Sequence, residues 1–221
     1  MQVSVLVSRV RAAIDELMAN DSGFLTQSSD EKNLDDIIND KMGDALQYVV
    51  ENAPLDKLGT TLLNTLTGTE LSNRFSIDST TLVGSLKLPA DLLRVVEARL
   101  SSWALYPKPE SDTSQVFLMQ SDEYTKGSWD RPVNILTYEG TERYLKMYSA
   151  KTPGDTLVFT YIAKPAVSSS SISIDVPPLL ESALVYEVAG MAMVAFREQV
   201  AQSLFALADR SIGIESKEVA A

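Results

Sequence analysis

Two kinds of apolar spacing divide this chain of 221 residues and restrict the folds open to it. Near both ends, apolar residues recur at steps of three and four, which is typical of amphipathic helices. In the middle, short stretches rich in Thr, Val, Ile, Leu and Tyr are separated by Pro, Gly and Ser, which is typical of strands. Because helices and strands are segregated along the chain, the pattern predicts an α+β fold.

The N-terminal part predicts two helices joined by a short connection. The first covers Val3–Met18 and stops at the polar residues that follow. The second opens at Ser28, where Glu31 completes a capping-box pattern, and it ends at Asn52, before Pro54. We expect an antiparallel hairpin with facing apolar stripes, because short connections favour antiparallel neighbours.

The middle of the chain predicts strands, of which at least three should pair antiparallel. Between residues 57 and 73 the pattern weakens, and we expect a loop with one helical turn. A short helix is expected at Ser121–Lys126, and Ser168–Ser171 has the composition of a flexible linker. Glu139-Gly140-Thr141 and Pro153-Gly154-Asp155 supply tight turns. The expected strands are Thr80–Lys87, Arg94–Ser102, Val133–Tyr138, Arg143–Ser149 and Leu157–Ala163.

The last long element predicts one helix from Leu179 to about Asp209, entered through Pro177 and Pro178. Its centre is apolar on nearly every side and rich in small residues, which permits close approach of other helices. The tail from Ser211 to Ala221 has no strong periodicity. The sequence therefore predicts a helical bundle, formed by the N-terminal hairpin and the long C-terminal helix (residues 1–73 and 172–221), with an inserted antiparallel β-rich portion (residues 74–171).

The chain has neither cysteine nor histidine, and this removes most familiar enzyme chemistry. It excludes disulfides, thiolate nucleophiles, metal sites built on these residues and the Ser-His-Asp arrangement. What remains is a carboxylate pair, a lysine nucleophile or a carboxylate-only metal site. There is no Walker loop and no GxGxxG motif. We therefore expect no enzyme, no catalytic residues, no cofactor and no metal.

No segment predicts a membrane span or a targeting signal. The longest apolar run, Val188–Phe196, has nine residues. A membrane-spanning helix needs roughly 18. We expect this run to be a buried helix, and the protein to stay in the compartment where it is made.

Acidic residues are concentrated in the second predicted helix and its flanks. Residues 21–57 hold nine acids and three lysines, which is −6 of the total net charge of −11. Asp36, Asp40 and Asp44 follow one another at i,i+4 spacing, and we call this row the acidic ridge. The ridge is either a solvated helix face or a field directed at a basic partner or at nucleic acid that must slide past. The total charge argues against a protein that grips a phosphate backbone.

A second cluster of carboxylates lies among aromatic residues. Asp122, Glu123 and Asp130 are close in sequence to Tyr124 and Trp129, as in the cleft of a glycosidase. The simpler interpretation is a cap and a turn. The remaining aromatic residues are concentrated in the β-rich portion, which favours core packing or subunit contact over ligand stacking.

Several short motifs carry a resemblance to a known family. They are Leu88–Arg94 (LPADLLR), Trp103, Ser121–Tyr124 (SDEY), Arg131–Val133 (RPV), Tyr148-Ser149 and Ile174–Leu180 (IDVPPLL) before an Ala-rich helix. Together they resemble head-to-tail adaptor proteins of short-tailed phages, in particular crAss-like phages and prophages of Bacteroides. The opening helical hairpin is also similar to that of phage connector adaptors.

The resemblance implies a structural protein of the virion neck, assembled in the host cytoplasm. It implies a ring, expected to be dodecameric, that binds beneath the portal protein, extends the DNA channel and offers a platform for the tail. DNA would pass without being specifically bound, and the acidic ridge would face the channel or a neighbouring subunit. The tail, with Ser211, Ile212, Ile214 and Val219, would dock on the portal.

Other functions stay open from the sequence alone. A different neck or tail ring, or a stopper protein, would share the assembly but contact other partners. A carbohydrate-binding or carboxylate-dependent hydrolase module would need converging carboxylates and exposed aromatic side chains in a cleft. A monomeric helical interaction module would form no ring.

Overall fold

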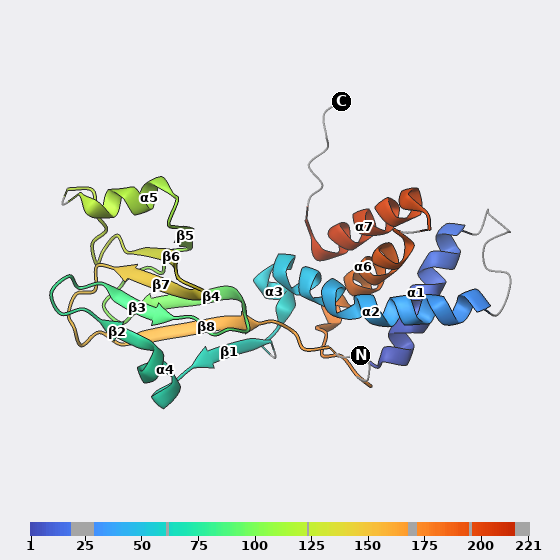
Figure 1. Cartoon of the computed structure of the whole chain (residues 1–221), viewed down its shortest axis with the longest axis horizontal. Coiled ribbons are helices and arrows are strands. Elements are labelled where there is room, and N and C mark those ends of the chain that lie inside the picture. The colour runs from blue at the N-terminus through green and yellow to red at the C-terminus, as the bar shows by residue number, and fades with distance from the viewer. Residues whose placement is uncertain (19–28, 61, 123, 168–171, 195, 215–221) are drawn as a thin grey trace, which may run out of the picture. The chain divides into compact units, whose positions relative to one another are not determined.

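The computed structural model of the chain describes residues 1–18, 29–60, 62–122, 124–167, 172–194 and 196–214. The chain divides into two compact units. The helical unit contains Met1–Leu62 and Pro165–Ala221, and the β unit contains Leu63–Lys164. The β unit starts at Leu63, whereas the sequence placed the start of the β-rich portion at residue 74. The fold is α+β, as predicted, with N-terminal helices, central sheets and C-terminal helices that pack on the N-terminal ones (Figure 1).

The helical unit is built around one central helix. Helices α1 (Val3–Met18) and α2 (Ser29–Asn52) are where the periodicity placed them, while the predicted cap at Ser28 lies outside the described residues. Both pack on α6 (Glu181–Met193), and they contact each other less than they contact α6. The apolar stripes of α1 and α2 therefore pack mainly on α6, and not on each other as the expected hairpin would require. Their fully buried residues include Leu6, Val10 and Ile14 on α1 and Ile38, Met42, Leu46 and Val49 on α2.

The predicted single C-terminal helix is wrong, because the chain forms two helices there. α6 ends at Met193, and α7 (Glu198–Ile212) folds back against it after Arg197, which has extended backbone angles (φ −150°, ψ 95°). The short 3₁₀ helix η2 (Pro178–Leu180) precedes α6. Residues 194–197 include no Gly or Pro, so the sequence carries no signal for the break. The small-residue centre of α6 does accept a close neighbour, and that neighbour is the chain's own continuation.

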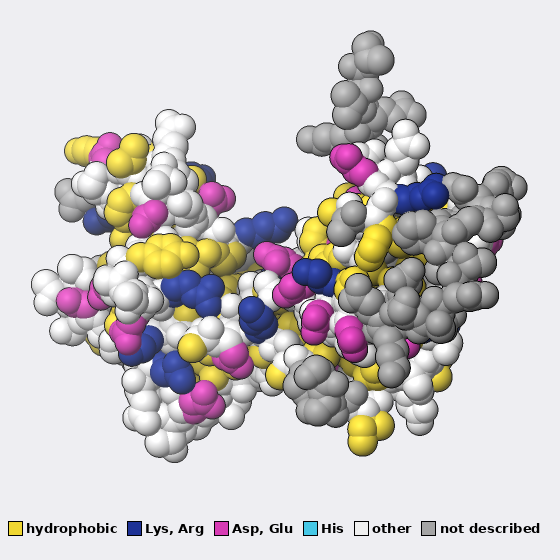
Figure 2. Space-filling view, turned by 45° about the vertical axis from the view of Figure 1, so that its right-hand side comes forward, with side chains coloured by type: hydrophobic (Ala, Val, Ile, Leu, Met, Phe, Trp, Pro, Cys, Tyr) yellow, Lys and Arg dark blue, Asp and Glu magenta, His cyan; other side chains and the backbone are white. Residues whose placement is uncertain are grey.

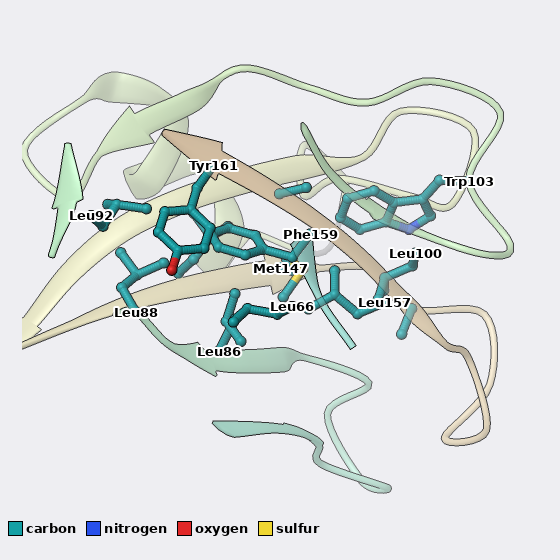
Figure 3. Packing of buried hydrophobic residues seen from close by; sticks show 13 residues of the cluster. Leu66, Leu86, Leu88, Leu92, Leu100, Trp103, Met147, Leu157, Phe159 and Tyr161 are labelled. Carbon is teal, nitrogen blue, oxygen red and sulfur yellow. The ribbon is translucent and has the colours of Figure 1, made fainter. Parts of the chain in front are cut away.

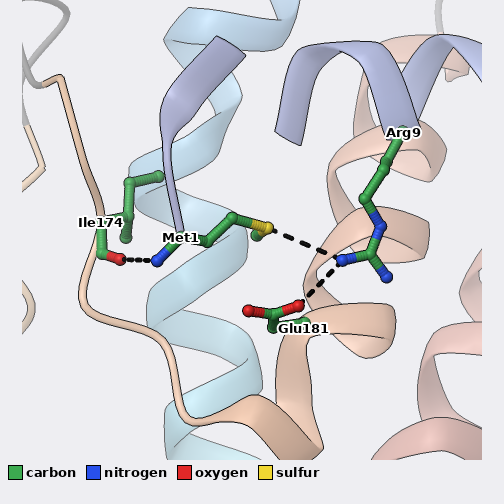
Figure 4. Close-up of polar contacts among 4 residues, drawn as sticks. All are labelled: Met1, Arg9, Ile174 and Glu181. Carbon is green, nitrogen blue, oxygen red and sulfur yellow. Dashed lines mark hydrogen bonds and ion pairs between the residues drawn. The ribbon is translucent and has the colours of Figure 1, made fainter. Parts of the chain in front are cut away.

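The N-terminus is tied to the segment that leads into α6. The amino group of Met1 donates a hydrogen bond to the carbonyl of Ile174 at 2.7 Å (Figure 4). Arg9 on α1 forms an ion pair with Glu181 at the start of α6, with 2.9 Å between Nη1 and Oε2 (Figure 4). Two segments from opposite ends of the sequence are thereby joined within one unit.

The β unit contains two sheets. In the three-stranded sheet, β8 (Leu157–Ala163) lies between β1 (Leu63–Leu66) and β4 (Leu92–Leu100), and both pairings are antiparallel (Figure 1). The five-stranded sheet has the order β2-β3-β7-β6-β5. Its strands are β2 (Phe75–Ile77), β3 (Gly84–Lys87), β7 (Glu142–Tyr148), β6 (Val133–Glu139) and β5 (Pro109–Ser111), and only the β5–β6 pairing is parallel. The five predicted strands and their antiparallel pairing are confirmed.

One hydrophobic core lies between the inner faces of these sheets (Figure 3). Leu86 and Leu145 come from the five-stranded sheet, and Leu100 and Phe159 come from the three-stranded sheet; all four are fully buried. Trp103 closes one end of the core, and its indole N–H donates to the carbonyl of Ser149 at 3.0 Å. In β7 and β8 the core residues occupy alternate positions, Leu145 and Met147 in β7 and Leu157, Phe159 and Tyr161 in β8, as in half-buried sheets.

Three local expectations differ from the structure. The weak region at 57–73 contains α3 (Leu55–Leu58), strand β1 and α4 (Gly68–Arg74), and not one loop. The helix expected at Ser121–Lys126 is wrong, because Tyr124 and Thr125 lie in a turn. A helix lies before this segment, as α5 (Gln115–Leu118) followed by the 3₁₀ helix η1 (Met119–Ser121). Its start is set by Ser114, whose hydroxyl accepts from the Phe117 N–H. The predicted linker Ser168–Ser171 lies outside the described residues.

Candidate functional site

The acidic ridge lies on the surface of the helical unit. Asp36, Asp40 and Asp44 are all exposed, while the opposite face of α2 is buried. No ion pair among the described residues includes these three carboxylates; the adjacent Asp35 pairs with Arg11 at 2.8 Å. The ridge is therefore a row of three like charges in contact with solvent.

The two units differ sharply in net charge. The helical unit has 8 basic and 18 acidic residues, a net charge of −10, whereas the β unit has 11 basic and 12 acidic residues, a net charge of −1. In the β unit, lysines compensate carboxylates locally, as in the pairs Lys146–Glu139 (2.9 Å) and Lys87–Glu142. Several Asp and Glu side chains are visible over the helical unit in Figure 2. Almost all of the protein's negative field therefore originates in the helical unit.

The helical unit also holds a buried carboxylate that sequence reasoning missed. Glu187, in the middle of α6, is only 4% exposed. Burial and the charge of Asp209 on α7 raise the pKa of Glu187 to about 7. Tyr48 on α2 donates a hydrogen bond to Asp209 Oδ1 at 3.0 Å, and burial together with this bond raises the pKa of Tyr48 to about 12. In the sequence, the only indication of this buried carboxylate is the presence of an acidic residue within the most apolar predicted helix.

The C-terminal tail begins later than the sequence indicated. Ser211 and Ile212 form the last turn of α7, and Ile212 is fully buried. Gly213 ends the helix in the left-handed region (φ 95°), and Lys57 Nζ donates to the carbonyls of Ser211 and Ile212 at 3.1 and 2.9 Å. Ile214 is partly buried, and Val219 lies outside the described residues. Portal docking by this segment stays a prediction.

The carboxylates around Trp129 serve local turns. Asp122 Oδ1 accepts the Tyr124 N–H at 2.9 Å. Asp130 accepts the Ser128 hydroxyl, and this bond lowers the pKa of Asp130. Glu123 lies outside the described residues. A glycosidase acid needs a raised pKa, so this geometry favours the cap-and-turn interpretation.

The aromatic residues of the β unit fall into two groups. Trp103 and Tyr161 are buried in the core, at 3% and 7% exposure. Others stand at the surface: Tyr106 (62% exposed), Tyr124 (98%), Trp129 (48%) and Tyr138 (67%). Exposed aromatic side chains are typical of protein interfaces. Core packing is therefore confirmed for Trp103 and Tyr161, and subunit contact stays a prediction for the exposed residues.

A hollow of about 270 Å³ lies beside Tyr138 in the β unit, and the sequence gave no indication of it. It is mostly apolar, and its single charged lining residue is Arg143. It forms where the starts of β4 and β5 meet the second half of β6, and β4 and β6 are distant in sequence. Its lining residues are Leu92, Leu93, Val95, Pro109, Leu136, Thr137, Tyr138 and Arg143.

Metal and membrane sites were also sought in the described parts of the chain. No group of three or more Asp and Glu side chains there is arranged to hold a metal ion. Of the helices described, none is both long enough and apolar enough to cross a membrane.

Comparison with protein families identifies the family of this chain. The model of a protein family described as SU10 adaptor protein matches residues 1–221, which is the whole chain. No curated protein matches the chain. The family is one of adaptors, a structural class.

Proposed function

Because this chain belongs to the SU10 adaptor protein family, we propose that it is a head-to-tail adaptor of a phage virion. In this function, copies of the chain form a ring beneath the portal protein, extend the DNA channel and offer a platform for the tail. The observation that carries the proposal is the family match over residues 1–221. Membership of the family gives a structural role in a phage; the ring, the channel and the narrower origin in crAss-like phages are proposed.

The charge distribution supports passage of DNA through such a ring. A channel wall that attracted phosphates would hold DNA, because each neutralised phosphate releases counterions and adds affinity. The acidic ridge has the opposite sign, and its three carboxylates are exposed. We place the ridge on the channel wall or against a neighbouring subunit.

The proposed partners are the portal protein, other neck or tail ring proteins and further copies of this chain. The C-terminal segment after α7 is the proposed portal contact. Closed rings use head-to-tail contacts, in which two different surfaces of each copy meet. Such contacts resemble the rest of the surface in overall polarity. The small, nearly neutral β unit with its exposed aromatic residues suits this kind of contact.

The experiment is a native mass measurement of the purified protein, alone and after mixing with the portal ring from the same genome. We expect a fixed, ring-sized number of copies to join each portal ring. An unrelated portal ring, mixed under the same conditions, is the control and should gain no copies. A mass that never changes with the cognate portal would overturn the adaptor role and favour another neck ring, a stopper protein or a monomeric interaction module.

A further inference from the structure

The hollow in the β unit has the chemistry of a socket for one aromatic side chain. Its volume of about 270 Å³ is below the roughly 300–1,000 Å³ of ordinary small-molecule pockets. Arg143 is held in the wall, because its Nη2 donates to the carbonyl of Leu92 at 2.9 Å. Thr137 Oγ1, also in the wall, is buried and has no hydrogen-bond partner among the described residues. Because this hydroxyl is buried, the wall presents mainly apolar atoms to an incoming side chain.

Tyr124 presents a complementary side chain elsewhere on the same unit. It is 98% exposed, the largest exposure of any large apolar side chain described. Its turn is braced by several hydrogen bonds: Asp122 Oδ1 accepts the Tyr124 N–H, Met119 O accepts the Thr125 hydroxyl at 3.2 Å, and Gln120 Oε1 accepts the Gly127 N–H at 3.0 Å. Hydrophobic side chains are visible around α5, which precedes this turn (Figure 2). Because these bonds hold the backbone of the turn, docking of Tyr124 costs little backbone conformational freedom.

The charges around the two features are complementary. Tyr124 directly follows two acidic residues, Asp122 and Glu123, in the sequence, and Asp122 is exposed. The single charged residue that lines the hollow is Arg143. An arginine beside an aromatic ring also contributes a cation–π attraction.

The turn and the hollow lie toward opposite ends of β6. The turn leads into β6 at Val133, which lines the same surface depression as Tyr124, whereas the hollow is lined by Leu136, Thr137 and Tyr138. At about 3.4 Å per residue, Val133 and Tyr138 are separated by about 17 Å along the strand. Two different patches that fit each other form a head-to-tail contact between copies, which closes into a ring when the rotation permits.

We propose that Tyr124 of one copy inserts into the hollow at Leu136 and Arg143 of a second copy. The aromatic ring of Tyr124 packs on the apolar wall of the hollow, and Asp122 approaches Arg143. This inference rests on the proposed ring and names its contact between neighbours. The contact is the anchor of a larger interface, as buried aromatic residues commonly are.

Cysteine cross-linking tests the contact directly, because the natural chain contains no cysteine. In a variant with both Thr125→Cys and Tyr138→Cys, which keeps Tyr124 and places the first cysteine at the exposed position beside it, mild oxidation should give a ladder of dimers, trimers and larger species on a non-reducing gel. Either single variant should give dimers at most, and a mixture of the two should give a heterodimer. The matched control combines Tyr138→Cys with Thr80→Cys, which places the first cysteine at another exposed position of the β unit.

The outcomes separate this contact from the proposed function. A ladder several-fold stronger than that of the control supports the contact. Equal cross-linking in both variants, or none in either, overturns it. If the wild-type protein joins the portal ring and the double variant gives no ladder, the adaptor role stands and this contact is wrong. If the ladder forms but no copy joins the portal ring, the contact stands and the adaptor role is wrong.

Discussion

Gly190 on α6 lies so close to Phe205 on α7 that a Cβ atom at position 190 would be 2.6 Å from the Cε1 atom of the ring. Carbon atoms pack at about 3.5–4.0 Å, so no larger residue fits without displacing the ring. The close approach is what lets α7 fold back along α6. The absence of a side chain at one position therefore determines the packing of the last helix.

We predict that Gly190→Ala lowers the free energy of unfolding by about 1–3 kcal/mol, the usual cost of overpacking. The matched control is Gly43→Ala on α2, where the new Cβ would lie 3.8 Å from its nearest neighbour, Val167. That change should raise stability by about 0.5–1 kcal/mol, because alanine is the better helix former. Urea unfolding of both variants measures the difference. Equal changes in the stability of the two variants would show that the contact between Gly190 and Phe205 does not govern the packing of α7. If the contact does govern it, adding Phe205→Leu to Gly190→Ala should restore part of the lost stability.

We predict that Glu187 makes the protein less stable as the pH rises from about 4.5 to about 7. Its pKa is raised from 4.5 to about 7 in the folded state, so the folded protein holds a proton that the unfolded chain releases. Stability falls with pH wherever the folded state binds more protons. At about 1.4 kcal/mol per pKa unit, the loss is at most about 3 kcal/mol.

Glu187→Gln should remove this part of the pH dependence, because the amide has a similar shape and does not ionise. The variant should be more stable than wild type at pH 8 and closer to it at pH 4.5. Thermal or urea unfolding across this range provides the comparison. Glu16→Gln, at an exposed position of α1, is the control and should follow the wild-type profile. A wild-type profile unchanged by Glu187→Gln would contradict the assignment.

The strands could be predicted from the sequence because their signal is local. In β7, for example, the buried residues Leu145 and Met147 alternate with partly exposed residues. The alternation of apolar and polar residues in the sequence therefore predicts the burial pattern. Strand β1 carries no such signal, since its four residues include Asn64 and Thr65, and its pairing with β8 depends on a partner far along the chain. The sequence likewise identified α1, α2 and the apolar helix on which both pack, but not the end of that helix at Met193.

The candidate interaction surfaces were only partly predictable, for the same reason. The acidic ridge follows from the helical period alone, and exposure of Asp36, Asp40 and Asp44 agrees with it. The break between α6 and α7 depends on the fit of Gly190 to Phe205, and the hollow depends on how β4 meets β6. Both features depend on contacts between residues that are far apart in the sequence. The spacing of apolar residues within one segment cannot predict such contacts.

We predict that neutralising the acidic ridge changes function and not folding. A variant with Asp36→Asn, Asp40→Asn and Asp44→Asn removes two like-charge i,i+4 pairs, each worth about 0.2–0.5 kcal/mol of repulsion, so its stability should be equal to or slightly above that of wild type. Virions with the variant should show altered assembly or slower DNA ejection, because the wall no longer repels phosphates. The control variant carries Asp15→Asn, Glu16→Gln and Asp56→Asn, three exposed acids of the same unit. Normal assembly and ejection in the ridge variant would remove the ridge from the proposed mechanism.

We predict that the segment after Ile214 is needed for portal binding and not for folding. Truncation after Ile214 keeps the contacts that end α7, because Ile214 N–H donates to Asp209 O and Lys57 donates to the carbonyls of Ser211 and Ile212. The melting temperature should therefore equal that of the full chain, while the number of copies that join the portal ring should fall to none in the native mass measurement. A control variant replaces the residues after Ile214 by a Gly/Ser segment of the same length, which tests whether their sequence or only their length matters. This variant should also fail to join the portal ring. If the truncated protein joins the portal in full number, the portal contact lies elsewhere on the chain, and the exposed ridge of α2 becomes the next surface to test.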